Sequence, residues 1–125
     1  MLSKRVPMES HTYHIGDIIF QEGDHGDCAY LIKSGQVKIT KIARDDQPRT
    51  IATLNAGNIL GEMALIDNEP RAASAVVLQD TEVLIISNEE FQKRLDGSDP
   101  VIGLLMQTFT NRLRQQAQQL VRMMS

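Results

Sequence analysis

The segment from Leu54 to Val77, LNAGNILGEMALIDNEPRAASAVV, carries the most informative pattern in this chain of 125 residues. It begins at the end of one predicted strand and ends inside the next. Gly61 is followed by good helix formers, and a polar turn, Asp67-Asn68-Glu69-Pro70, leads to Arg71. One helical turn after Gly61 would present free backbone N–H groups to an anion, and the guanidinium of Arg71 suits a phosphate. The segment therefore predicts a phosphate-binding loop between two strands.

Glu62 lies beside this expected anion site. A carboxylate would not face a phosphate directly, so we interpret Glu62 as an acceptor for hydroxyl groups such as those of a ribose. An anion site, a hydroxyl acceptor and an apolar wall built by the sheet together indicate a nucleotide. Each residue alone is weak support, because a Gly-Glu pair or an Arg at the start of a strand is common on a solvated surface. The prediction depends on their joint spacing.

The region from residue 11 to about residue 87 is predicted to be β structure. Short runs rich in Ile, Val, Leu, Tyr and Thr alternate with Gly, Asp, Asn and Pro. Ser34-Gly35 predicts a two-residue hairpin, and Asp45-Asp46-Gln47-Pro48 predicts a longer one. Six to eight short strands at this spacing are typical of an antiparallel sandwich, jelly roll or barrel. The predicted strands are 11–14, 18–22, 28–33, 36–43, 49–54, 71–78 and 82–86.

The last third of the chain is predicted to be helical. Ser87 and Glu90 form a capping box before a short helix over 88–95. Asp96-Gly97-Ser98 ends that helix, and Asp99-Pro100 supplies an N-cap and a first-turn proline for a helix of about 24 residues, roughly 36 Å long. Part of its apolar face needs a partner outside the β domain, and we expect it to pair two chains. This apolar stripe consists of Met106, Phe109, Leu113, Ala117, Leu120 and Met124.

Composition and charge exclude several classes of protein. The single Cys excludes an intramolecular disulfide and favours a reducing, cytoplasmic compartment. We expect no signal peptide, because no apolar run follows the basic residues near the start, and the sequence has no apolar run of the length that spans a membrane. Residues 1–99 hold ten basic and sixteen acidic residues, a balance of −6, whereas residues 100–125 hold three Arg and no acid. This balance disfavours general nucleic-acid binding, which needs clustered Lys and Arg.

The run Gly61-Glu62-Met63-Ala64-Leu65-Ile66-Asp67 with Pro70-Arg71-Ala72-Ala73-Ser74 resembles the phosphate-binding cassette of cyclic nucleotide-binding domains. The stretch from Gly16 to Val37, with its repeated Gly-Asp pairs and Ser34-Gly35, is similar to the first strands of that family. The resemblance covers about residues 10–125. One departure is Leu60, where many members have an aromatic residue. A Leu still fills an apolar position, so the departure changes little.

The resemblance implies an α+β, mainly β fold: an eight-stranded antiparallel β-roll (jelly roll), with a short helix in the cassette and C-terminal helices. It implies that Arg71 pairs with a cyclic phosphate, that the amides of Ala64 and Ala72 add donors, and that Glu62 accepts from the ribose 2′-hydroxyl. Ala72 favours cAMP, because family members that bind guanine often carry Ser or Thr there. The predicted ligand-binding residues are Gly61, Glu62, Met63, Ala64, Arg71, Ala72, Ala73, Ser74, Arg112 and Gln116.

We expect one domain, with the β-roll and short helix over 1–99 and the long helix over 100–125. By its start and by Asn111 to Arg114, the long helix is similar to the dimer helix of the catabolite activator group; Arg112 and Gln116 are its candidates for contacting the base. The function implied is a cytoplasmic cAMP sensor that relays ligand binding through the C-terminal helix to a partner. We expect a homodimer, a possible protein effector, no nucleic acid and no membrane. The initial Met favours a small independent protein over a fragment.

Other classes stay open. A metal-dependent cupin would need His and carboxylate ligands that converge, but His11, His14 and His25 lack the required spacing. A nucleophilic role for Cys28 would need a base, and no His lies near it in the sequence. Neither an enzyme nor a metal or organic cofactor is therefore expected. The remaining alternatives are a cGMP-specific sensor and a dimerisation or interaction module whose ligand site is degenerate.

Overall fold

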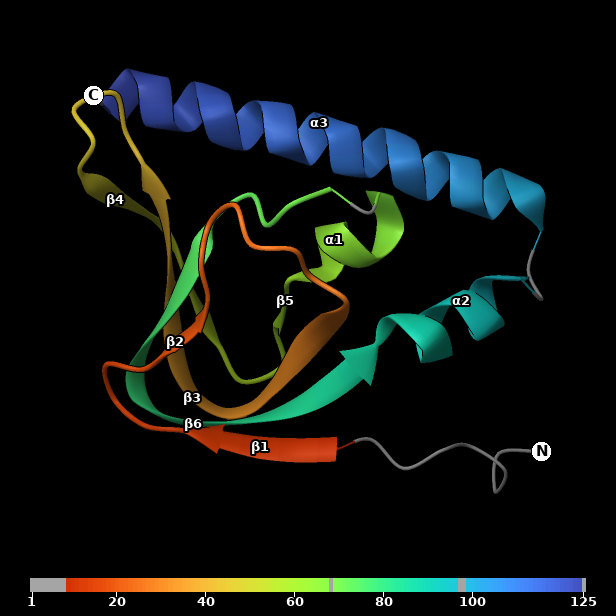
Figure 1. Cartoon of the computed structure of the whole chain (residues 1–125), viewed down its shortest axis with the longest axis horizontal. Coiled ribbons are helices and arrows are strands. Elements are labelled where there is room, and N and C mark those ends of the chain that lie inside the picture. The colour runs from red at the N-terminus through yellow and green to blue at the C-terminus, as the bar shows by residue number, and fades with distance from the viewer. Residues whose placement is uncertain (1–8, 68, 97–98, 125) are drawn as a thin grey trace.

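The computed structural model describes residues 9–67, 69–96 and 99–124, and it has the mainly antiparallel β architecture that the sequence predicts. Asn68 of the predicted turn and Gly97-Ser98 of the predicted helix break lie outside the described residues. Figure 1 shows a rolled sheet with one long helix across its open side. The strands are β1 (Glu9–Tyr13), β2 (Ile18–Phe20), β3 (Cys28–Ile42), β4 (Pro48–Asn55), β5 (Ile59–Leu60) and β6 (Ser74–Ser87). The helices are α1 (Glu62–Asp67), α2 (Asn88–Asp96) and α3 (Pro100–Met124).

Two long strands, β3 and β6, form the centre of the sheet. They pair with each other from Cys28 opposite Ser87 to Thr40 opposite Ser74. Strands β1 and β2 pair with β6, and β4 and β5 pair with β3, all antiparallel. The described residues form six strands: β3 and β6 each join two of the seven predicted segments, and β5 is an additional strand.

The predicted hairpin at Ser34-Gly35 is wrong, because β3 continues through these residues. The pairing of β3 with β6 shifts register around Ser34, which is the signature of a bulge that bends a strand without reversing it. Gly35 has φ = +107°, and a Cβ on it would lie 2.3 Å from Thr81 Oγ1. The Gly at this position therefore permits both the backbone angle and the close approach of β6.

The other β expectations are met more closely. The loop between β3 and β4 is a hairpin at the predicted place, with the Ala43 amide donating to Gln47 O at 2.9 Å. Strand β5 was not predicted, because two residues are too short for a periodic signal. Arg71 is not part of a strand; β6 begins three residues later, at Ser74.

The hydrophobic core lies inside the roll, between the inward-facing residues of β3 and β6. On β6 the buried residues alternate, as expected for a strand with one face against a core. Leu60 of β5 fills the end of this core nearest to α1 and is 2% exposed. The core consists of Tyr30, Ile32, Val37, Leu60, Ala75, Val77 and Val83.

Both predicted helix caps are present. Ser87 Oγ accepts from the Glu90 amide at 3.1 Å, and Asp99 Oδ1 accepts from the Val101 amide at 2.9 Å. The helix that Asp99 caps, α3, crosses over α1 and ends near the β3–β4 hairpin (Figure 1). No helix in the described part of the chain is long and apolar enough to cross a membrane.

The face of α3 that packs on the β domain is only partly the predicted apolar stripe. Thr110 and Val121 are buried against the domain, with Met106 and Ala117 beside them. The rest of the stripe turns outward, and the side chain of Met124 lies outside the described residues. Two more exposed apolar residues, Ile102 and Leu105, lie about two turns and one turn before Phe109 and continue this outward part toward the start of the helix. This outer apolar stripe consists of Ile102, Leu105, Phe109, Leu113 and Leu120, each more than 40% exposed.

Candidate functional site

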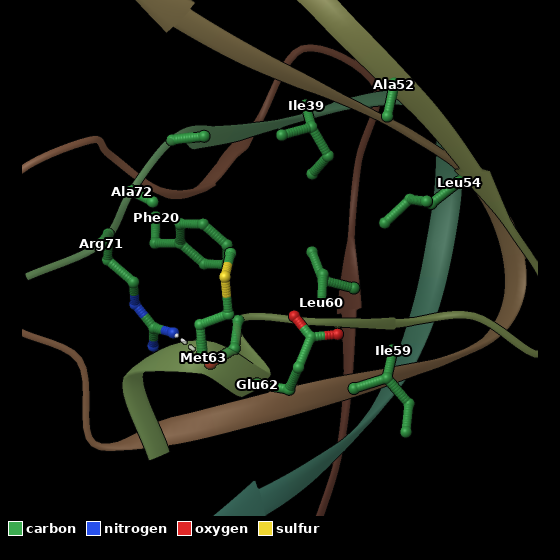
Figure 2. Close-up of a pocket in the computed structure, with 12 residues that line it drawn as sticks. Phe20, Ile39, Ala52, Leu54, Ile59, Leu60, Glu62, Met63, Arg71 and Ala72 are labelled. Carbon is green, nitrogen blue, oxygen red and sulfur yellow. Dashed lines mark hydrogen bonds between the residues drawn. The ribbon is translucent and has the colours of Figure 1, made fainter. Parts of the chain in front are cut away.

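A cavity of about 240 Å³ opens between the sheet and the segment predicted to bind phosphate. Its aliphatic wall comes from β3, β4 and β5, Arg71 lies at the opposite side, and in Figure 2 the Glu62 carboxylate is seen between Arg71 and the β5 residues Ile59 and Leu60. Arg71 therefore marks the polar end of a largely apolar pocket, and such a lining with a few polar groups is usual for sites that bind small organic ligands. The lining residues are Phe20, Ile39, Ala52, Leu54, Ile59, Leu60, Gly61, Glu62, Met63, Arg71, Ala72 and Ala73.

Arg71 is the cationic residue that lines this cavity, and it is only 5% exposed. Its Nη1 donates to Gly61 O at 3.0 Å and its Nη2 to Cys28 O at 2.8 Å. Its Nε is buried and has no hydrogen-bond partner in the described part of the chain. A buried guanidinium with a free N–H and no carboxylate partner is a strong candidate for binding an anion.

The backbone on both sides of the cavity fixes the position of Arg71. Its amide donates to Asp24 O at 2.8 Å, and its carbonyl accepts from the Gly23 amide at 2.9 Å, so the β2–β3 loop holds the residue like a strand partner. Gly26 of the same loop leaves room for the guanidinium, since a Cβ there would lie 2.3 Å from Arg71 Cζ. The segment from Gly23 to Gly26 thus positions Arg71, which lies 45 residues after Gly26.

Glu62 is the first residue of α1 and points into the cavity (Figure 2). Burial raises the pKa of its carboxyl above the usual value of 4.5. Hydrogen bonds from the amides of Glu62 and Met63, and the charge of Arg71, oppose that rise. A partly desolvated carboxylate that forms no ion pair with the described residues is well suited to accept hydrogen bonds from ligand hydroxyls.

The amides of Ala72 and Ala73 are further donors at the cavity. Both residues line it, and no acceptor for either amide occurs among the described residues. Unpaired backbone N–H groups are uncommon away from water and normally face solvent or a ligand. Together with Arg71 they form a short run of donors at the polar end of the cavity.

The structure brings together most of the predicted site residues. Six of them, Gly61, Glu62, Met63, Arg71, Ala72 and Ala73, line the cavity. Ala64 lies in α1, although its side chain is outside what the structure describes. Ser74 is the first residue of β6, and its Oγ accepts from the Glu22 amide at 2.8 Å. Arg112 and Gln116 are exposed on α3 and do not line this cavity.

Two other side chains of α3 do reach the cassette, which comprises residues 61–74. Gln107 Nε2 donates to Ile66 O at 2.7 Å, and Arg114 Nη1 donates to Pro70 O at 3.0 Å. The two donors are seven residues apart and so share one face of the helix. The acceptors are the last turn of α1 and the residue before Arg71. These two contacts, the cassette bridges, join α3 directly to the predicted phosphate-binding segment.

Sequence reasoning missed the aromatic and carbonyl surroundings of Arg71. The rings of Phe20 and Tyr30 flank the guanidinium, and the Cys28 carbonyl accepts from it. The Cys28 thiol donates to the Tyr30 hydroxyl at 3.2 Å, and burial raises the pKa of that hydroxyl. Phe20 lies within the upstream motif, but nothing in its spacing relates it to Arg71.

The residues considered for metal binding do not come together. Within the described ranges, no group of three His, Cys, Asp or Glu side chains is arranged to hold a metal ion. His14 lies near Asp80 on the exposed surface, with 3.7 Å between Nδ1 and Oδ1.

Comparison with known proteins identifies the same region. The family model for the cyclic nucleotide-binding domain matches residues 10–98. Over 107 residues the chain is 36% identical to the cyclic AMP receptor protein of Thermus thermophilus, covering 86% of this chain and 50% of that protein. It is 35% identical over 101 residues to the cAMP-dependent protein kinase regulatory subunit of Hypocrea atroviridis, covering 81% of this chain and 20% of that subunit. The chain thus spans half or less of these relatives.

A solved structure is also similar. The cAMP-bound form of the EAL enzyme Bd1971 superposes with a TM-score of 0.81 at 40% identity, covering 87% of this chain and 29% of that one. A cGMP-bound form of the same enzyme superposes with a TM-score of 0.78 at 42% identity, covering 85% of this chain and 28% of that one. The rolled sheet, the cassette with its buried Arg71 and the match over residues 10–98 agree: this chain belongs to the cyclic nucleotide-binding domain family.

Proposed function

We propose that this protein is a sensor that binds a cyclic nucleotide, cAMP, in the cavity between the sheet and the cassette. The observation that carries the proposal is Arg71: a buried guanidinium with a free Nε at the polar end of an apolar cavity. The cyclic phosphate takes the guanidinium and the nearby amides, and the base lies along the aliphatic wall. Binding, and no chemical reaction, is the proposed activity.

Each predicted site residue has a proposed role. Arg71 pairs with the phosphate, and the amides of Ala64, Ala72 and Ala73 donate to its oxygens. Glu62 accepts from the ribose 2′-hydroxyl, with Gly61 and Met63 beside it.

Three further residues have indirect roles. Ser74 supports the site through Glu22, to which its Oγ is hydrogen-bonded. Arg112 and Gln116 would meet the base only if α3 or a second subunit moved toward the cavity.

The choice of cAMP over cGMP is supported by the small side chain at Ala72. A guanine needs partners for its exocyclic amine and carbonyl, and Ala72 offers no hydroxyl. The relatives include a cyclic AMP receptor and a cAMP-dependent kinase subunit, but Bd1971 is solved with either nucleotide. A cGMP-specific sensor is therefore the alternative that a side-by-side titration has to address.

The relay of ligand binding is supported by the cassette bridges. A ligand that orders the cassette changes the positions of the Ile66 and Pro70 carbonyls, to which Gln107 and Arg114 of α3 are hydrogen-bonded. A ligand that prefers one arrangement of these contacts shifts α3 toward it. The signal then passes to a partner that touches α3.

A homodimer through α3 is supported by its outer apolar stripe. Five large apolar residues repeat at near-heptad spacing and are solvent-exposed in the single chain. Exposed apolar patches of this kind usually mark interfaces. The same stripe favours the second candidate function, a dimerisation module whose ligand site is degenerate.

Paired calorimetric titrations with cAMP and cGMP test the proposal. Saturable binding of cAMP, at least tenfold tighter than that of cGMP, is expected. Absence of binding of either nucleotide at millimolar concentration would overturn the sensor, and a dimeric mass in solution would then favour the dimerisation module. Tighter binding of cGMP would favour the alternative sensor.

A further inference from the structure

Lys41 is nearly buried behind the segment that follows Arg71. Its side chain is 12% exposed, and Lys is rarely buried unless it is paired. Its Nζ donates to Ala72 O at 2.5 Å and lies 3.2 Å from Glu22 Oε2. The ammonium therefore joins an acidic residue, two positions after β2, to a backbone carbonyl of the cassette.

Glu22 is itself held in place on two sides. Its Oε1 accepts from the Ile42 amide at 2.9 Å, and its own amide donates to Ser74 Oγ at 2.8 Å. Since Glu22 is bonded to both β3 and β6, its carboxylate is a fixed counter-charge for Lys41. A long, flexible side chain thus has its ammonium fixed at two points, and this loss of rotamer freedom needs a compensating interaction.

The peptide that Lys41 holds is the one between Ala72 and Ala73. The described residues contain no cis peptide bonds, and in a trans peptide the C=O and N–H point in opposite directions. The Ala73 N–H therefore points away from Lys41. Ala72 and Ala73 line the cavity, Lys41 does not, and neither amide has an acceptor in the described part of the chain.

We propose that Lys41 is a positioning residue for anion binding in this cavity. By holding and polarising the Ala72 carbonyl from behind, it orients the Ala73 N–H toward the anion and strengthens it as a donor. Glu22 keeps the ammonium in place, so most of the effect is exerted through the peptide instead of through net charge. This inference rests on the proposed function, because it concerns the phosphate of the same ligand.

The test compares Lys41→Met with Lys38→Met in the full chain. Lys38 lies on the same strand, and its side chain forms no hydrogen bond or ion pair with the described residues, so its replacement removes an equal charge without touching the cassette. By calorimetry, Lys41→Met is expected to weaken cAMP binding about three- to tenfold, the worth of one hydrogen bond. Lys38→Met is expected to stay within about twofold.

Amide NMR provides a readout that a merely structural ion pair would not change. In the unmodified protein, cAMP is expected to shift the Ala73 amide proton downfield, and Lys41→Met is expected to remove most of that shift. If Lys41→Met does not fold, Lys41→Gln replaces it with the same expectations.

Three results separate the possible failures. Unchanged affinity and an unchanged Ala73 shift in the Lys41 variant would overturn the positioning role. An equal loss in Lys38→Met would overturn it too, because the effect would then be one of charge. Failure of the unmodified chain to bind cAMP would overturn the proposed function itself.

Discussion

The guanidinium carbon of Arg71 lies 4.4 Å from the centre of the Phe20 ring. The cation therefore has an aromatic face on one side and two backbone carbonyls at its Nη atoms, which together stabilise a charge away from water. Nothing in this arrangement neutralises the charge. An anion at the free Nε would add an opposite charge to these neutral partners, so we expect a large gain in binding free energy only for ligands that carry a negative charge.

The substitution Arg71→Ala is expected to weaken cAMP binding at least tenfold. The reason is the loss of charge-assisted hydrogen bonds worth about 1.5–3 kcal/mol. The affinity of Arg71→Lys for cAMP is expected to lie between those of the unmodified protein and Arg71→Ala, because an ammonium keeps the charge but lacks the planar shape of the guanidinium. Isothermal calorimetry measures the affinities, and circular dichroism checks the fold. Arg49→Ala, which removes an Arg paired with Asp45 on the surface, is the control. An affinity unchanged in Arg71→Ala would refute the assigned role.

Gly26→Ala tests whether the position of the Arg71 guanidinium determines the affinity for cAMP. The added Cβ would overlap the guanidinium, which sits at the flexible end of its side chain and can move away. We expect weaker cAMP binding, by about tenfold, with little loss of stability. Gly103→Ala is the matched control: its Cβ meets nothing, so helix stability should rise by about 0.5–1 kcal/mol and binding should not change. Equal affinity in the two variants would contradict the prediction.

Glu62→Gln is expected to stabilise the ligand-free protein at pH 7. Burial raises the pKa of Glu62, so the charged form is less favourable in the folded than in the unfolded chain. The favourable contribution of the protonated group is complete below its usual pKa of 4.5 and is lost as the pH rises through the raised value. Thermal unfolding followed from pH 4 to pH 8 should show a gain in Tm for the variant at the upper end only.

The same variant should bind cAMP less tightly, because a neutral amide oxygen is a weaker acceptor for the ribose hydroxyl. Glu89→Gln, at an exposed position in α2, is the control for both measurements. A gain in Tm of equal size at pH 4 and pH 7 would show that desolvation of the charge is not the cause.

Leu113→Glu is expected to convert a dimer into a monomer. Leu113 lies in the middle of the outer apolar stripe and is 51% exposed in the single chain, so a charge there would be buried without a partner in the dimer. Leu104→Glu is the matched control, since Leu104 is 68% exposed on nearly the opposite side of the same helix. Light scattering after size exclusion gives the mass. A monomeric unmodified protein, or an equal effect of both variants, would contradict the interface.

Loss of both cassette bridges, in Gln107→Ala with Arg114→Ala, is expected to uncouple α3 from the ligand. Hydrogen exchange along α3 should respond to cAMP in the unmodified chain and respond less than half as strongly in the double variant. Binding affinity should change less than tenfold, since neither side chain lines the cavity. Gln118→Ala, at an exposed position of the same helix, serves as the control. A full response of α3 in the double variant would place the coupling elsewhere.

Local signals in the sequence were sufficient for the helix caps and for the central residues of the site. Ser87 and Asp99 cap helices as predicted, because a cap is a contact between residues two or three apart. The fixed spacing of Gly61, Glu62 and Arg71 placed them at one cavity.

Contacts between distant residues were not predictable in the same way. Whether Gly35 reverses a strand or bends it depends on Thr81, which lies 46 residues further along the chain. The role of Lys41 depends on two backbone groups that have no signature in the side-chain pattern. The inward face of α3 is set by the shape of the domain beneath it, so Thr110 is buried while the more apolar Phe109 is exposed.

Strand β6 begins at Ser74, the last residue of the cassette, and ends at Ser87, directly before α2. Fourteen residues at about 3.3 Å each make it a rigid spacer of roughly 45 Å along the chain, paired with β3 over almost its whole length. A strand held in this way does not stretch or slide by fractions of a residue, because any slip would turn its buried side chains outward. We therefore expect the sheet to be the stationary frame of the molecule, so that any motion linked to the proposed ligand would involve the loops and α3 instead.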